Sequence, residues 1–503
     1  MTLLTTLAHL QAAESGRAQR LSTVRHHHLV DRPLVIVPLT LAGEAAAPLA
    51  AMVGTDRRDP ALLVVPQPRD RELRFGFFAE LARIVLPYIE ARQAETETVP
   101  AVRGREERLR HADAPQVLVP NRNGIGYLRL LGRSTRFGRT DGPHPVDASV
   151  PLLGRWLTFL VERAEYPGAA VLAAVTELLA AQWATGQSAR EDANLAALMG
   201  WIDPPAGMTG TQAALIAEDP LRCPPAGPAT DPGFDRVILQ PAIDKYDRAC
   251  ASDSTVARER ALASLSEALE KQLTPTWELM WRGIDLLRAL PEAPGAVTRW
   301  AEDRQRFTAF STYLTEGGAP QPRRDQAVSA ASRLYRMERA QAAFDAQRAL
   351  DDPFVLAELR TTGEAFGGTV VAREPTRTVP GAKGRTTLRP GFTVRTDDPL
   401  RIGPGKPLVR PGRPKDKAQI RQITHDGTDD GDARLVVLEV TGGMGTPNKP
   451  TAEAVPQVGE EVRYIIDPGY WSHREFPSVE ETPWTHGGPP EDMPAGDDDD
   501  FEE

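Results

Sequence analysis

Cysteine is scarce in this sequence, because only Cys223 and Cys250 occur in 503 residues. Two thiols cannot form a disulfide framework or a four-thiolate zinc site, so both classes of protein are excluded. Such cysteine usage is typical of a reducing cytoplasm, where we expect the protein to reside.

Long hydrophobic runs are also missing. A membrane span needs about 18 uncharged apolar residues, and the best candidate, residues 168–181, is interrupted by Glu177. The first positive charge is Arg17, so the start of the sequence lacks the basic region of a secretory signal. We therefore expect no contact with a membrane.

The sequence lacks the common catalytic and nucleotide-binding motifs. Residues 403–407 resemble a phosphate-binding loop only superficially, with proline where Ser or Thr would hold magnesium. Residues 123–126, Asn-Gly-Ile-Gly, are too short for a dinucleotide fingerprint and predict a hairpin turn. We assign no catalytic residue and expect no cofactor. An active site assembled from distant residues stays open as an alternative.

Three adjacent histidines, His26, His27 and His28, are the only clustered imidazoles. Neutral imidazole is a good metal ligand. Neighbouring side chains in a strand point to opposite faces, however, so at most His26 and His28 could share a site. We favour an ordinary strand or loop and predict no metal site.

Apolar residues are plentiful, at 41% of the chain, beside 25% charged residues. A chain of this length usually divides into several domains. Helical spacing of apolar residues and short runs bounded by Gly, Pro and Asp predict an α+β multidomain protein. The expected order is an N-terminal helix (1–24), a small α/β domain (25–145), a helical segment (146–202), a proline-rich linker (203–234), a helical bundle (235–366), a small β-barrel of OB or SH3-like size (367–467) and a disordered acidic tail (468–503).

Charge arrangement is the strongest functional signal. Residues 373–421 hold thirteen Lys or Arg against four acids, within a chain whose net charge is -10. Basic strands and loops of a small barrel would bind phosphates by releasing counterions. A solvated, proline-rich loop is the competing interpretation. The predicted nucleic-acid-binding residues are Arg389, Arg395, Arg401, Lys406, Arg410, Arg413, Lys415, Lys417 and Arg421.

A weaker basic cluster lies between residues 103 and 139, where all nine cations are arginine. Guanidinium groups suit bidentate phosphate contacts. Arginine is also the commonest cation of this sequence, so an ordinary surface is the favoured interpretation. The candidate second patch comprises Arg122, Arg129, Arg133, Arg136 and Arg139.

The C-terminal end has the opposite charge. Residues 475–503 hold eleven acids and no Lys or Arg, which predicts a self-repelling, disordered segment. It could bind a basic partner or compete with nucleic acid for the basic residues of 373–421.

These observations favour a non-enzymatic bacterial accessory protein of a nucleic-acid-processing complex. DNA or RNA would contact the basic β domain, and a protein partner such as an ATPase, helicase or nuclease would complete the complex, in DNA repair or phage (antiviral) defence. The alternative is a protein–protein scaffold or regulator that binds no nucleic acid.

Overall fold

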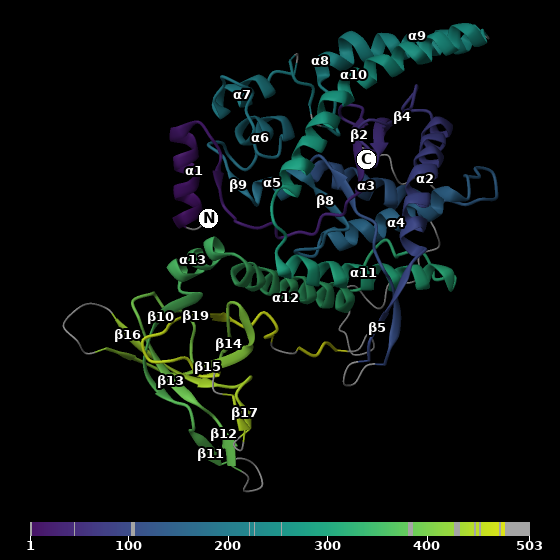
Figure 1. Ribbon diagram of the computed structural model, residues 1–503. Helices are drawn as coiled ribbons and strands as arrows, with labels where there is room; N and C mark the ends of the chain where they lie inside the picture. The colour runs from purple at the N-terminus through teal and green to yellow at the C-terminus, as the bar shows by residue number, and fades with distance from the viewer. Residues whose placement is uncertain are drawn as a thin grey trace.

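An α/β body and a β-barrel form the two ends of the molecule, and two helices lie between them (Figure 1). The computed structural model describes residues 3–477 except 45, 102–105, 221, 226, 253, 381–385, 427–432, 447–448, 452–453 and 472–473. The predicted acidic tail therefore lies mostly outside the described residues.

A five-stranded sheet, in the order β4-β3-β2-β7-β8, forms the centre of the α/β body. Its strands are β2 (Leu34–Thr40), β3 (Pro48–Gly54), β4 (Ala61–Val64), β7 (Val117–Val119) and β8 (Leu172–Ala174). The first three pair antiparallel, whereas β2, β7 and β8 are parallel. Every residue of β2, β3, β7 and β8 is buried, as expected for strands covered on both faces.

Four helices cover one face of the sheet, where residues such as Ile36 and Val53 face a core that includes Phe78 and Phe307. These helices are α2 (Arg71–Gln93), α3 (Arg122–Thr135), α4 (Ser149–Ala164) and α11 (Pro294–Thr315). The sequence predicts a hairpin turn over 123–126, but α3 begins there instead. The Asn121 side chain accepts a hydrogen bond from the Gly124 amide and so caps the helix.

The opposite face of the sheet packs against α5 (Val175–Ala180), α6 (Leu195–Ile202) and the long helix α10 (Thr255–Arg288). Leu269, Leu273 and Trp277 of α10 share a core with Val35 and Met52 of the sheet. The sequence predicts a separate bundle over 235–366, whereas α10 and α11 complete the two faces of the sheet. An amphipathic helix carries the same pattern whether it packs on helices or on strands.

The other elements of the body are short or peripheral. They are α1 (Leu3–Ser15), β1 (Gln19–Arg20), β5 (Thr96–Val99), β6 (Arg108–His111), β9 (Trp183–Ala184), α7 (Gly210–Ala217), α8 (Pro232–Phe234), the π-helical turn η1 (Asp235–Leu239) and α9 (Gln240–Ala251). Helix α9 and the first half of α10 project from the top of the body (Figure 1). None of the helices that the structure describes is long and apolar enough to cross a bilayer.

The C-terminal β domain is a closed barrel of six strands in the order β10-β13-β16-β15-β14-β19, which confirms the predicted small barrel. The strands are β10 (Ala365–Glu374), β13 (Gly391–Thr396), β14 (Pro407–Arg410), β15 (Arg413–His425), β16 (Arg434–Val440) and β19 (Glu461–Ile466). Phe366, Phe392, Leu438 and Tyr464 fill its interior. Two small hairpins extend from it: β11 (Thr378–Pro380) with β12 (Thr386–Leu388), and β17 (Gly445–Thr446) with β18 (Lys449–Pro450).

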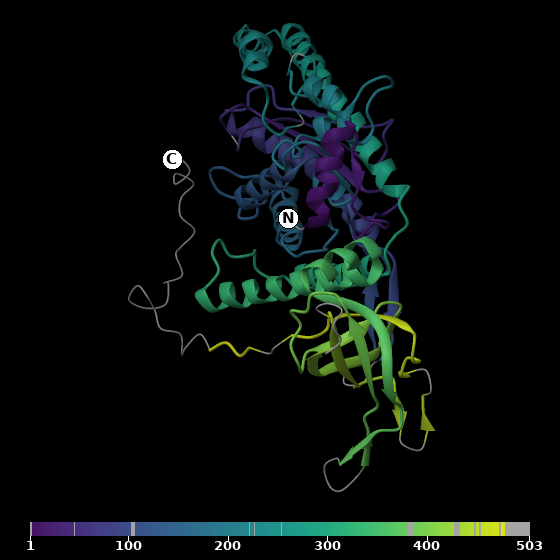
Figure 2. The ribbon, with the colours of Figure 1, turned by 90° about the vertical axis from the view of Figure 1, so that its left-hand side faces the viewer.

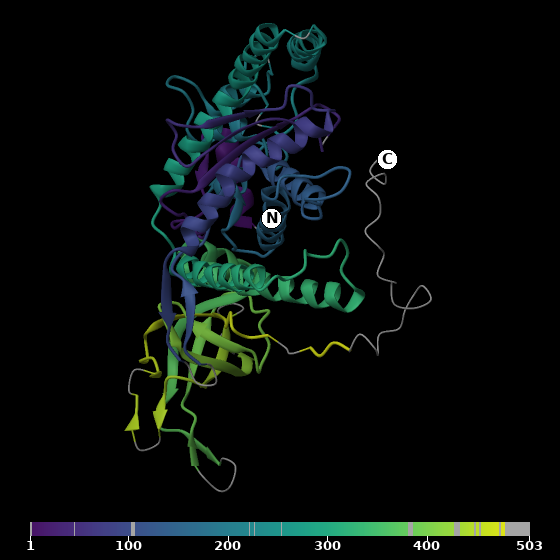
Figure 3. The ribbon, with the colours of Figure 1, turned by 90° about the vertical axis from the view of Figure 1, so that its right-hand side faces the viewer.

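Helices α12 (Ala327–Asp351) and α13 (Pro353–Thr362) join the body to the barrel. Val355 and Leu356 of α13 pack with Val409 and Ile465 of the barrel in a small separate core. The first half of α12 projects to one side of the molecule (Figures 2 and 3).

Candidate nucleic-acid interface

Three arginines converge on one carboxylate on the outside of the barrel. Glu439 on β16 lies 2.8 Å from a guanidinium nitrogen of Arg377 and 3.8 Å from those of Arg389 and Arg421. The Gln419 side chain also donates a hydrogen bond to Glu439 at 3.3 Å. We call these five residues the Glu439 cluster. A second carboxylate, Glu374, lies 3.9 Å from Arg377. Two carboxylates beside three guanidinium groups leave the cluster with a net positive charge.

Strand pairing explains why these side chains meet. Glu439 pairs with Gly391 of β13 on one side and with Gln419 of β15 on the other. Arg421 lies at an irregularity between Ile420 and Gln422, where β15 gains one residue relative to β16. A β-bulge redirects a side chain, and Arg421 here turns toward Glu439.

Six of the nine cations predicted on the barrel contact an acidic side chain. Besides Arg389 and Arg421 in the Glu439 cluster, the pairs are Arg395 with Asp426 (2.6 Å), Arg410 with Glu460, Arg413 with Asp416 (3.6 Å) and Lys417 with Asp467 (2.5 Å). Most of these acids follow the basic segment in the sequence. Residues 365–467 as a whole hold sixteen Lys or Arg against thirteen Asp or Glu, which is far more balanced than residues 373–421 alone.

The remaining three cations are exposed. The Lys406 ammonium lies 5.1 Å from the centre of the Tyr470 ring. Arg401 and Lys415 have no side-chain partner among the residues that the structure describes. The nine cations therefore do not form one unpaired patch; the Glu439 cluster is their densest grouping.

The second patch divides into two parts. Arg122, Arg129 and Arg133 are spaced by two turns and one turn of α3, so they share one face of the helix. Arg136 instead turns inward, at 3% exposure, and donates hydrogen bonds to the carbonyls of Gln321 (2.9 Å) and Pro322 (3.2 Å). Arg139 pairs with its neighbour Asp141 on the surface. Arg136 is thus a structural residue that fixes the end of α3 to the chain before α12.

An open groove of about 360 Å³ lies beside the exposed arginines of α3. Its lining residues come from α3, from the end of α4 and from the projecting half of α12: Arg122, Arg129, Glu165, Ala330, Arg333, Leu334 and Met337. We call it the α3/α12 groove. The α12 side of the groove is not predictable from the sequence, because about 200 residues separate the two helices.

The three histidines point to three different environments. His26 lies 3.5 Å from Asp352. The His27 ring contacts Phe344, with centroids 5.4 Å apart. His28 stacks on Trp300 and its Nδ1 lies 2.8 Å from Glu292. Among the described residues, no group of three or more His, Cys, Asp or Glu could hold a metal ion.

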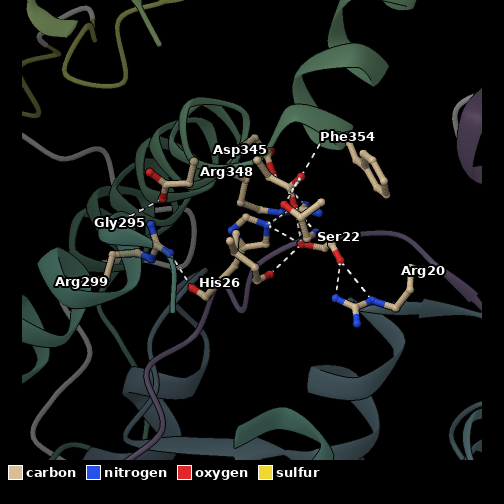
Figure 4. Close-up of polar contacts among 12 residues, drawn as sticks. Arg20, Ser22, His26, Gly295, Arg299, Asp345, Arg348 and Phe354 are labelled. Carbon is tan, nitrogen blue, oxygen red and sulfur yellow. Dashed lines mark hydrogen bonds and ion pairs between the residues drawn. The ribbon is translucent and has the colours of Figure 1, made fainter. Parts of the chain in front are cut away.

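Ser22, His26 and Asp352 form a buried polar junction whose residue types resemble a nucleophilic triad (Figure 4). The geometry differs from one: the Ser22 hydroxyl donates directly to Asp352, and both Ser22 and Asp352 approach the same ring nitrogen, Nε2, of His26. In a Ser-His-Asp triad the serine and the carboxylate contact opposite ring nitrogens, and among the described residues His26 Nδ1 has no hydrogen-bond partner. With Ser22 fully buried, the junction is a structural clamp.

The clamp also determines the charge of Asp352. Burial alone would raise its pKa, but hydrogen bonds from His26, Ser22 and the amides of Phe354 and Thr23 outweigh burial and hold the pKa below its ordinary value. Asp352 also caps α13 through the Phe354 amide, at 2.9 Å. The ionised carboxylate therefore ties the extended segment after β1 to the α12–α13 corner.

The carboxyl ends of the parallel strands, where α/β sheets usually bind ligands, are covered by the chain itself. The Thr40 amide donates to the Pro228 carbonyl at 2.7 Å, and the Asn121 side chain donates to the Gly227 carbonyl at 2.9 Å. Part of the predicted linker 203–234 thus packs across this edge.

Comparison of the chain with protein-family models, curated proteins and solved structures gives no match.

Proposed function

We propose that this chain is a non-enzymatic accessory protein of a bacterial nucleic-acid-processing complex, and that DNA or RNA contacts the outside of its barrel. The Glu439 cluster carries the proposal. It gathers three guanidinium groups from separate segments of the chain on one face of a rigid element.

The chemistry of the cluster suits a phosphate backbone. Arginine presents several donors in a planar fork that matches phosphate oxygens. The contacts of Arg389 and Arg421 to Glu439 are long, at 3.8 Å, and their side chains are 32% and 45% exposed. Long, partly exposed contacts of this kind contribute little, so a phosphate can approach both arginines while Arg377 stays on Glu439.

A salt-dependent gel shift tests the proposal. We expect the full chain to bind single- or double-stranded DNA or RNA at low salt. Arg389→Ala with Arg421→Ala should weaken binding about tenfold. The negative slope of log K against log salt should become shallower by about 0.9 for each lost contact to duplex DNA.

The matched control is Arg190→Ala with Arg306→Ala, two exposed arginines of the α/β body. This control should have nearly the same affinity and the same salt dependence as the unaltered chain. Absence of binding by the unaltered protein at low salt would remove the proposal, as would equal losses in the two double variants.

A second candidate, a protein–protein scaffold or regulator, is favoured by one observation. Leu3, Leu7 and Leu10 lie along one face of α1 and are 63%, 51% and 56% exposed. Helical spacing of exposed leucines is typical of a surface that receives a partner helix. If a partner such as an ATPase, helicase or nuclease copurifies with the chain, Leu7→Glu should abolish that association without changing nucleic-acid binding.

A further inference from the structure

We propose that the α3/α12 groove is the docking site of the chain's own C-terminal acidic segment, residues 478–503. This inference does not depend on nucleic-acid binding by the barrel. It rests on the lining of the groove, on the place where the described chain ends, and on the composition of the segment.

The groove combines positive charge with an apolar floor. Arg122, Arg129 and Arg333 line it beside one lining carboxylate, Glu165. Arg333 also pairs with Asp325 at 2.8 Å, from outside the lining. Leu334 is 57% exposed, and Met337 lies one turn further along α12. A nucleic-acid phosphate backbone would contact the arginines but leave the apolar surface exposed. A peptide with both carboxylates and apolar side chains would contact both.

The arginines of the groove remain accessible to a competing carboxylate. Arg122 is 84% exposed and lies 3.5 Å from Glu177, and Arg129 is 40% exposed beside Glu165. Arg133, one turn beyond Arg129, is also exposed. Exposed pairs of this kind contribute little to stability, so an incoming acidic segment can replace them at little cost.

The described chain ends on the same helix that forms one wall of the groove. Trp471 and Phe476 pack against Tyr335 of α12, with ring centroids 5.6 and 5.7 Å apart. Figures 2 and 3 both show this last segment running alongside the projecting half of α12. Tyr335 is the immediate neighbour of Leu334 in the helix.

The remaining length is sufficient to reach the groove. Twenty-six residues follow Pro477, and an extended chain spans about 3.3 Å per residue. The path needed is on the order of one helix diameter, about 10–12 Å. A tethered segment also competes at an effective concentration of about 1 mM or more.

The composition of the segment complements the groove. Residues 478–503 contain ten Asp or Glu, no Lys or Arg, and the aromatics Trp484 and Phe501. The carboxylates match the arginines of α3 and α12, and an aromatic side chain matches the exposed surface of Leu334 and Met337. Docking would cover Arg122 and Arg129 of α3 and leave the barrel face open.

The test is photo-crosslinking in the full chain. The photoreactive residue p-benzoylphenylalanine is placed at position 334, and crosslinked peptides are identified by mass spectrometry. We expect position 334 to crosslink within one molecule to peptides from 478–503. The matched control is the same residue at position 215 on α7, where Leu215 is 63% exposed; it should not reach that segment.

A charge-reversed variant separates specific docking from mere proximity. Arg122→Glu with Arg129→Glu should lower the crosslinked fraction about tenfold, equivalent to about 1.4 kcal/mol, while Arg190→Glu with Arg306→Glu should not change it. Thermal unfolding temperatures confirm that each variant folds. The proposal is wrong if position 334 never crosslinks to 478–503, if position 215 does so equally, or if an added DNA oligonucleotide is captured at position 334 in place of the segment.

Discussion

The ring of His27 is neutral in the folded protein. Burial, together with the nearby charges of Arg299 and Arg348 and the ring of His26, lowers the pKa of His27 to about 3. In the unfolded chain the pKa of histidine is about 6.5.

This difference predicts a pH-dependent stability. Between pH 6.5 and 3 the unfolded chain binds a proton at His27 that the folded protein does not, so stability falls as the pH falls through this window. At pH 5 the loss relative to pH 7 should be about 2 kcal/mol. In His27→Gln most of this loss of unfolding free energy should disappear. The measurement is urea unfolding at pH 7 and pH 5.

The control for this prediction is His144→Gln, which alters a histidine on the exposed surface. It should keep the pH dependence of the unaltered protein. Equal pH dependence in His27→Gln and the unaltered chain would contradict a neutral His27 in the folded state.

At the scale of elements, the sequence predicts the positions of helices and strands better than it predicts which elements pack together. The sequence predicts a small β-barrel over 367–467, and the barrel strands β10 to β19 span residues 365–466. Helix α3 was missed, because Asn-Gly favours a turn when no distant contact is known. The packing of α10 on the sheet could not be read from its periodicity, since one apolar stripe fits either partner.

The hydrogen bonds of Asn121 at the N-terminus of α3 predict a measurable effect on stability. Asn121 accepts from the Gly124 amide and donates to the buried carbonyl of Gly227. Asn121→Ala should therefore cost about 1–3 kcal/mol, combining a lost cap with a carbonyl left unpaired. The measurement is the free energy of urea unfolding.

Ser254→Ala is the matched comparison, because Ser254 caps the exposed start of α10 through one bond to the Ala257 amide. We expect a loss of at most about 1 kcal/mol there. If Asn121→Ala costs no more than Ser254→Ala, the bond to Gly227 contributes nothing.

At the scale of the whole molecule, the candidate site shows what sequence can and cannot reveal. Counting charges located the arginines at 389 and 421, but their carboxylate, Glu439, lies outside the basic segment. The α3/α12 groove needs Arg129 and Arg333, which only the tertiary structure brings together. Cations were therefore predictable, whereas their neutralisation and grouping were not.

The attachment of the barrel provides a prediction at this scale. Asp398 accepts two bonds from Arg360 of α13, at 2.6 and 3.1 Å, and one from the Gly367 amide of β10 at 2.7 Å. Asp398→Ala should loosen the barrel from α13, so that calorimetry resolves a separate barrel transition below that of the body. Hydrogen exchange should increase in α13 and β10 and stay unchanged in β2 and β3.

Asp141→Ala, which removes only the surface pair with Arg139, should retain the melting profile of the unaltered chain. One cooperative transition in both variants would show that Asp398 does not couple the barrel to α13.

The packing of α10 on the first strands has a consequence for how the protein is made. The side chains of β2 and β3 that face α10 leave the ribosome more than 200 residues before Leu265 and Trp277 do. At 5–20 residues per second, that interval lasts roughly ten to fifty seconds. During translation the half-built sheet therefore presents bare aliphatic surface, and chaperones that shield nascent chains should bind it until α10 emerges.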